Sequence, residues 1–123
     1  MSMETLESLK SRQRVFRVFY RDYVNDVAVS SAQPESMLAD RIAPLAESVL
    51  QHADNFIGVI DANELVLQLY LDDDESSVFV ELLYPEGKGM LRLNMPWEQA
   101  VALLTGLPEA FDEGLLPGAQ YIA

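Results

Sequence analysis

The chain has 123 residues, half of them hydrophobic, and a formal net charge of −12. Its length suits one domain with a real core, and the apolar content excludes the disorder that acidic chains poor in apolar residues show. The absence of cysteine excludes disulfides, thiolate catalysis and cysteine-based metal sites. Most of the surface would repel nucleic-acid phosphates and anionic lipid, so we expect no nucleic acid and no membrane as partner, and a basic protein instead.

Residues 1–30 form a basic, amphipathic N-terminal segment, and its spacing favours a helix over residues 4–25. An apolar stripe recurs every three or four residues, and a basic stripe follows the same rhythm on another face: Lys10, Arg14, Arg17 and Arg21. A strand through residues 15–20 is the alternative, because β-branched and aromatic residues dominate there. In that case Asn25 and Asp26 would form a two-residue turn before the apolar run 27–29.

Residues 34–53 are predicted to be helical. Pro34 suits a first helical position, and an apolar stripe follows at Leu38, Ile42, Leu45 and Val49. Pro44 lies inside this stretch, so we expect a kink there or two shorter helices.

Residues 55–94 contain four short apolar runs separated by turn-rich segments. The connections are too short for a crossover helix, so they predict a four-stranded antiparallel meander. Leu65, Leu67, Leu69 and Leu71 share one face of their strand, and Val66, Gln68 and Tyr70 occupy the other. This alternation is typical of a sheet that is covered on one face by helices.

Residues 95–112 are predicted to be helical again, and residues 113–123 to be an irregular tail. The expected fold is therefore a single α+β domain over residues 1–123. It has N-terminal helices, then the meander, then a C-terminal helix packed on one face of the sheet.

The sequence contains little catalytic or metal-binding chemistry. The only histidine, His52, has no spaced partner, and the run Asp72–Glu75 lacks the glycine and the distal glutamate of a calcium loop. We therefore expect no catalytic residue, no metal and no cofactor. Acid–base catalysis by two carboxylates remains open as an alternative function, although no pair is singled out among the twenty acidic residues.

The acidic turn is the first candidate contact surface, because adjacent carboxylates in one turn repel each other unless a counter-charge is present. The residues expected to meet a basic partner are Asp72, Asp73, Asp74, Glu75, Glu81 and Glu86. The stripe Lys10, Arg14, Arg17 and Arg21 is a possible second docking face. It would meet the acidic body of another copy and form a homodimer.

The segment 54–61, the runs 65–70 and 78–82, and the later stretch 96–107 together resemble small bacterial immunity proteins encoded beside polymorphic or contact-delivered toxins. The resemblance lies in strand order and acidic turns, and it transfers no functional residue. It implies a cytoplasmic, non-catalytic inhibitor that covers a basic toxin. The alternative is an acidic secretion chaperone for an effector. Two helices before an uninterrupted meander depart from the helix-strand-helix alternation that we expect of such a chaperone. The first residues lack the features of a secretory signal, which also favours the cytoplasm.

Overall fold

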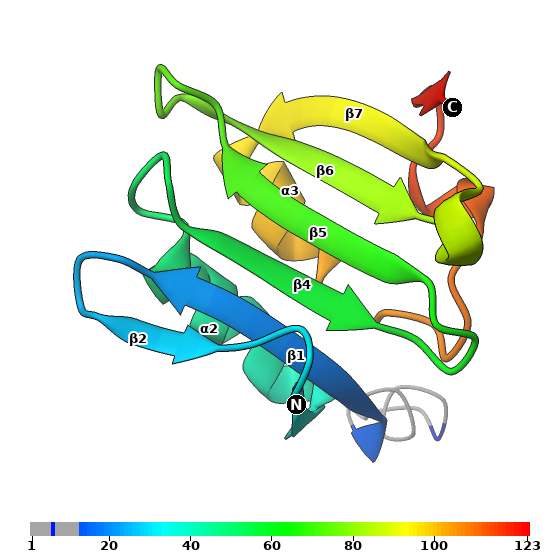
Figure 1. Cartoon of the computed structure of the whole chain (residues 1–123), viewed down its shortest axis with the longest axis horizontal. Helices are drawn as coiled ribbons and strands as arrows, with labels where there is room; N and C mark the ends of the chain where they lie inside the picture. Colours follow the sequence, from blue (N-terminus) through cyan, green and yellow to red (C-terminus); the bar gives the residue numbers. More distant parts are fainter. Residues whose placement is uncertain (1–5, 7–12) are drawn as a thin grey trace.

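The computed structural model describes residue 6 and residues 13–123, and these residues form one eight-stranded antiparallel sheet with two short helices on one face (Figure 1). The strand order is β2-β1-β4-β5-β6-β7-β8, and β3 also pairs with β1. The strands are β1 (Val15–Asp22), β2 (Val27–Val29), β3 (Glu35–Leu38), β4 (Phe56–Ile60), β5 (Val66–Leu71), β6 (Ser77–Leu83), β7 (Met90–Pro96) and β8 (Gln120–Ile122). The α-helices are α2 (Ile42–Val49) and α3 (Trp97–Leu103), and the 3-10 turns are η1 (Ala39–Arg41), η2 (Pro85–Gly87) and η3 (Glu113–Leu115).

The expected fold class is wrong, first of all at the N-terminus. Where a helix was expected, β1 pairs with β2 through a tight turn and with β4 on its other side. The turn forms because the carboxylate of Asp22 accepts hydrogen bonds from the backbone amides of Val24 and Asn25. Asp26 then adopts a φ of 52°, which short acidic side chains tolerate. The earlier part of the expected helix, including Lys10, lies outside the described residues.

The expected helix over residues 34–53 is also mostly wrong. β3 pairs with the first half of β1, η1 follows, and only α2 is α-helical. Pro44 is the third residue of α2, where a backbone amide has no intrahelical acceptor. Proline therefore fits this first turn without a kink.

The C-terminal third of the chain also contains more strand and less helix than expected. β7 continues to Pro96, α3 ends at Leu103, and the expected tail contributes β8, which pairs with β7. The segment between α3 and β8 is held to the sheet because the buried carboxylate of Asp61 accepts a hydrogen bond from the backbone amide of Phe111 at 2.6 Å. The strands β4 to β7 do follow one another as antiparallel neighbours, but they are half of a larger sheet.

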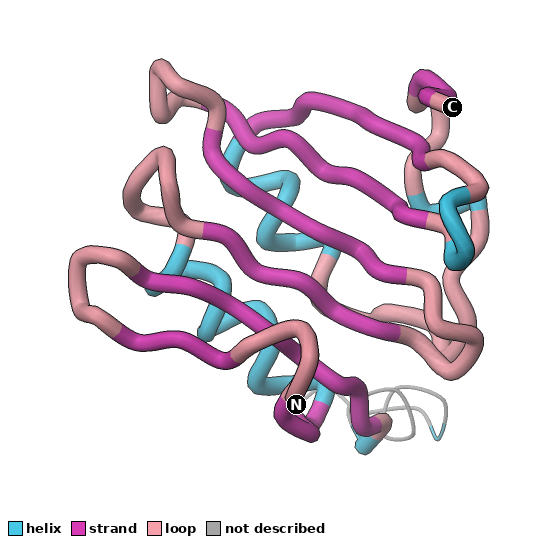
Figure 2. Tube along the Cα trace, in the orientation of Figure 1, coloured by secondary structure: helices cyan, strands magenta, loops and turns pink. Residues whose placement is uncertain are grey.

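The two faces of the sheet have different environments. Leu67, Leu69 and Leu71 are buried on the face that α2 and α3 cover, together with residues of every central strand. Figure 2 shows both helices on that one side, while the opposite face has no helix over it. On this open face the strands carry Val66, Gln68 and Tyr70 in alternation with the buried leucines, and these side chains are half-buried.

Candidate protein-binding surface

Three connections meet at one end of the sheet: the β1–β2 turn, the α2–β4 connection and the β5–β6 turn (Figure 1). The register pairs Phe56 with Tyr70. Continued by two residues, it places Asp54 level with Asp72 at the ends of neighbouring strands. We call the five carboxylates that project here the acidic end: Asp54, Asp72, Asp73, Asp74 and Glu75.

Backbone hydrogen bonds fix the β5–β6 turn. The amide of Asp72 donates to the carbonyl of Ser77 at 2.9 Å, and the amide of Glu75 donates to the carbonyl of Asp72 at 2.8 Å. The carboxylate of Asp74 accepts the amide of Ser76 at 3.0 Å, and this bond lowers the pKa of Asp74. Glu75 has a φ of 58°, a conformation that costs a glutamate free energy. The turn thus holds its carboxylates in a defined arrangement in water.

The acidic end has no counter-charge from the described part of the chain. The ion pairs among the described residues join Arg17 to Glu64, Arg21 to Asp26, Lys88 to Glu86 and Arg92 to Glu81. None of these pairs includes a member of the acidic end. No ion pair from residue 6 or residues 13–123 therefore compensates the negative charge at this end, and a cationic surface would complement it.

Glu81 does not belong to this surface, although it was expected to contact a partner. It lies on the open face but is only 4% exposed. Its carboxylate accepts hydrogen bonds from the Tyr70 hydroxyl at 2.8 Å and from Arg92 Nε at 2.8 Å, with Gln68 at 3.3 Å. Burial and the bond to Glu81 raise the pKa of Tyr70, and the same carboxylate raises the pKa of Arg92. Glu81 thus ties β5, β6 and β7 together.

Glu86 lies apart from the acidic end for a different reason. It is exposed in η2, at the opposite end of β6 from the β5–β6 turn. A seven-residue strand spans about 20 Å, so Glu86 and Asp74 lie too far apart to form one patch. Conversely, sequence analysis missed Asp54, because only the strand register brings its connection level with the β5–β6 turn.

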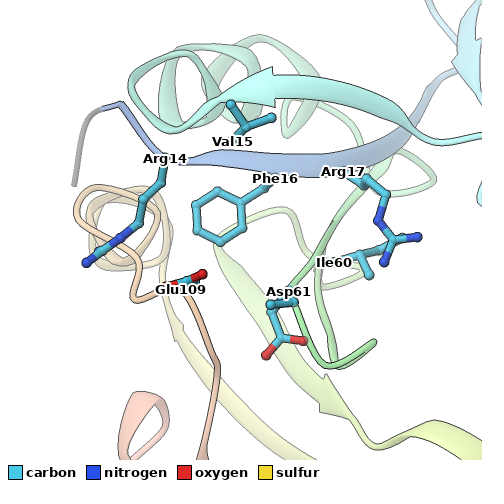
Figure 3. Close-up of a pocket in the computed structure, with 8 residues that line it drawn as sticks. Arg14, Val15, Phe16, Arg17, Ile60, Asp61 and Glu109 are labelled. Carbon is cyan, nitrogen blue, oxygen red and sulfur yellow. The ribbon is translucent and has the colours of Figure 1, made fainter. Parts of the chain in front are cut away.

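The expected basic stripe does not form, because only Arg17 and Arg21 share the open face of β1, and Arg14 precedes the strand. Arg14 donates to the carbonyl of Leu107 at 2.9 Å, Arg17 pairs with Glu64, and Arg21 pairs with Asp26 and lies 4.5 Å from the centre of the Tyr23 ring. Figure 3 shows the Arg14 and Arg17 side chains on opposite sides of Phe16. The helical stripe is absent because this segment is a strand, and Lys10 lies outside the described residues.

The hollow beside these arginines is a structural junction. It is lined by Arg14, Arg17, Asp61 and Glu109, among others (Figure 3). Asp61 is 1% exposed, and its carboxylate accepts the backbone amides of Asn63, Leu65 and Phe111. With those three donors, Asp61 orders the β4–β5 turn and holds the 109–111 segment against it.

Within residue 6 and residues 13–123, no group of three or more His, Cys, Asp or Glu side chains is arranged to hold a metal ion. None of the helices described is long and apolar enough to cross a membrane. No known protein family matches the chain, and comparisons with curated proteins and with solved structures gave no significant match.

Proposed function

We propose that this chain is a non-catalytic protein-binding domain that docks its acidic end onto a basic protein, in the manner of an immunity-type inhibitor that covers a toxin. The observation that carries the proposal is a group of five carboxylates that two neighbouring connections present at one end of the sheet and that form no ion pair with any described residue. Such a surface would raise the association rate with a cationic partner through long-range attraction.

The buried carboxylates also fit a binding domain better than a carboxylate enzyme. Asp22, Asp61 and Glu81 are each at most 6% exposed, and each accepts at least three hydrogen bonds from the chain itself. Carboxylates satisfied in this way hold the fold, whereas a general acid or base must face a bound substrate. The acidic end, which is exposed, is where a partner would find unsatisfied charge.

The test is to capture the partner from the native cell, purify it, and measure binding to the wild type and to a triple variant, Asp72→Asn, Asp73→Asn and Asp74→Asn. Asparagine keeps the acceptor oxygens that hold the turn and removes three charges. We expect the association rate to fall at least about tenfold at low salt, and the deficit to shrink as salt rises.

A matched triple variant controls for total charge: Glu35→Gln, Glu47→Gln and Glu113→Gln remove three exposed charges from β3, α2 and η3. Its association rate should stay within about twofold of the wild type. Equal losses in the two triple variants, or a partner surface without basic residues, would contradict docking through the acidic end.

A further inference from the structure

A shallow hollow of about 320 Å³ opens on the sheet beside the acidic end. It is lined by Ala53, Asp54, Phe56, Gln68 and Tyr70. Phe56 and Tyr70 are direct cross-strand partners on the open face of β4 and β5, and their rings contact those of Phe19 and Phe79 respectively. The hollow therefore combines two aromatic walls with one carboxylate at its edge.

The polar groups of the hollow favour a cation. Asp54 is exposed and forms no ion pair with any described residue. Gln68 donates its amide hydrogen to Glu81, and its carbonyl oxygen accepts no bond within the described part of the chain. The Tyr70 hydroxyl also donates to Glu81, so the groups left to a ligand are hydrogen-bond acceptors and π faces.

The chain itself shows how a guanidinium group sits on such rings. Arg21 lies over Tyr23 at 4.5 Å, and Arg92 lies over Phe79 at 5.7 Å, next to Tyr70 in the same row of aromatic residues. A cation over an aromatic face gains free energy from the ring quadrupole, and arginine adds planar stacking. The hollow at Phe56 and Tyr70 offers similar ring faces. Arg21 is the cross-strand partner of Phe56, but it engages Asp26 and Tyr23 and does not line the hollow.

We infer that this hollow receives an arginine side chain that projects from the partner, with Asp54 pairing the guanidinium and Phe56 and Tyr70 packing on its faces. The inference deepens the proposed function, and it rests on that function only for the source of the arginine. The remaining carboxylates of the acidic end then attract basic residues around this anchor.

The test uses a short peptide in place of the partner. Acetyl-Gly-Arg-Gly-amide is titrated into the isotope-labelled full chain and followed by NMR, in parallel with the same peptide carrying citrulline, the uncharged isostere of arginine. We expect the arginine peptide to shift the backbone signals of Asp54, Phe56, Gln68 and Tyr70, and to bind at least about tenfold more tightly than the citrulline peptide. Equal binding of the two peptides would overturn the inference. So would shifts confined to residues 72–75, because they would mark diffuse attraction to the turn.

Two variants separate the parts of the hollow. Asp54→Asn and Phe56→Leu should each weaken the arginine peptide about threefold or more, while Glu47→Gln, which removes an exposed charge from α2 on the helix side of the sheet, should leave binding unchanged. Full binding by Phe56→Leu, in a variant whose spectrum shows the native fold, would overturn the aromatic contact. If the arginine peptide caused no shifts, the hollow would not be an arginine site. The experiment with the partner and the triple variants would still test the proposed function.

Discussion

Asp22 ends β1 and connects three segments through one carboxylate. It accepts the amides of Val24 and Asn25, and it bonds the side-chain amides of Asn25 at 2.7 Å and of Asn55 at 3.1 Å. Asn55 in turn bonds the carbonyl of Val49 at the end of α2. The N-terminal hairpin, α2 and β4 therefore depend on the charge state of Asp22.

These bonds, the one from the Asn25 side chain above all, lower the pKa of Asp22 from its usual value of 3.8. The unfolded chain therefore takes up the proton before the folded chain does as the pH falls. The stabilisation is complete above about pH 5, and it is lost as the pH drops from the unfolded pKa through the lower folded one. Asp22→Asn should accordingly lower the urea midpoint of unfolding near pH 7, because asparagine turns an amide donor toward Asn25.

The gap in midpoint between the wild type and Asp22→Asn should stay constant from pH 7 to pH 5 and narrow below about pH 4. Urea titrations followed by circular dichroism at five pH values would measure it. Asp26→Asn is the control, since its side chain is 86% exposed in the same turn and asparagine tolerates the left-handed conformation there. A gap as wide at pH 3 as at pH 7 would show that the Asp22 charge contributes nothing.

Within the β5–β6 turn, Glu75 adopts a strained backbone conformation, and its negative charge is not needed for the chain to turn there. Glu75 has a φ of 58°, and glycine adopts this conformation without the steric cost that a side chain adds. Glu75→Gly should therefore stabilise the fold by about 0.5–1 kcal/mol while it weakens the proposed partner contact. Thermal unfolding and partner affinity would be measured on the same preparation.

Glu86→Gly is the matched control for that variant, because Glu86 has a φ of 61° in an exposed turn at the other end of β6. We expect it to gain similar stability and to keep full affinity for the partner. If Glu86→Gly weakened the partner as much as Glu75→Gly did, the contact surface would extend beyond the acidic end.

The elements differ in how well they could be predicted from the sequence. The alternation of Leu67, Leu69 and Leu71 with Val66, Gln68 and Tyr70 predicted β5 and its covered face correctly. A strand over residues 15–20, which β1 confirms, was only the alternative to a helix, because this run has a single charged residue and no clear alternation. Phe19 points to the open face yet is only 6% exposed. Its ring covers Gly58, where a Cβ would lie 2.0 Å from the ring, so the glycine of the neighbouring strand makes room for it. A short, mostly apolar run also fits a helical period.

The remaining errors concern features that depend on contacts between distant segments, which the local sequence pattern does not reveal. β3 and β8 have four and three residues, which is too few for a periodic signal, and their pairing with β1 and β7 creates them. At the candidate site, the exposed turn 72–75 was predicted. The burial of Glu81 depends on Tyr70 and Arg92 from neighbouring strands, and only the register reveals it.

For the whole molecule, repulsion among the carboxylates of the acidic end should lower the stability of the fold when no partner is bound. Like charges a few ångströms apart in water repel by about 1 kcal/mol, and salt screens this repulsion over about 10 Å at 0.1 M. The triple variant with asparagine at positions 72, 73 and 74 should thus gain about 1 kcal/mol of stability relative to the wild type when salt is lowered from 0.5 M to 10 mM, as measured by urea unfolding. Loss of the Asp74 charge that accepts the Ser76 amide costs the variant some stability at every salt concentration, so the salt-dependent gain is the quantity that reports the repulsion.

The position of the charges, and not their number, should decide this gain. The triple variant at Glu35, Glu47 and Glu113 also loses three negative charges, but from sites on three separate elements. It should gain less than half as much stability in 10 mM salt, because each removed charge had few close neighbours. Equal gains in both variants would mean that the net charge of −12 acts as a whole, and that no local repulsion at the acidic end awaits a cationic partner.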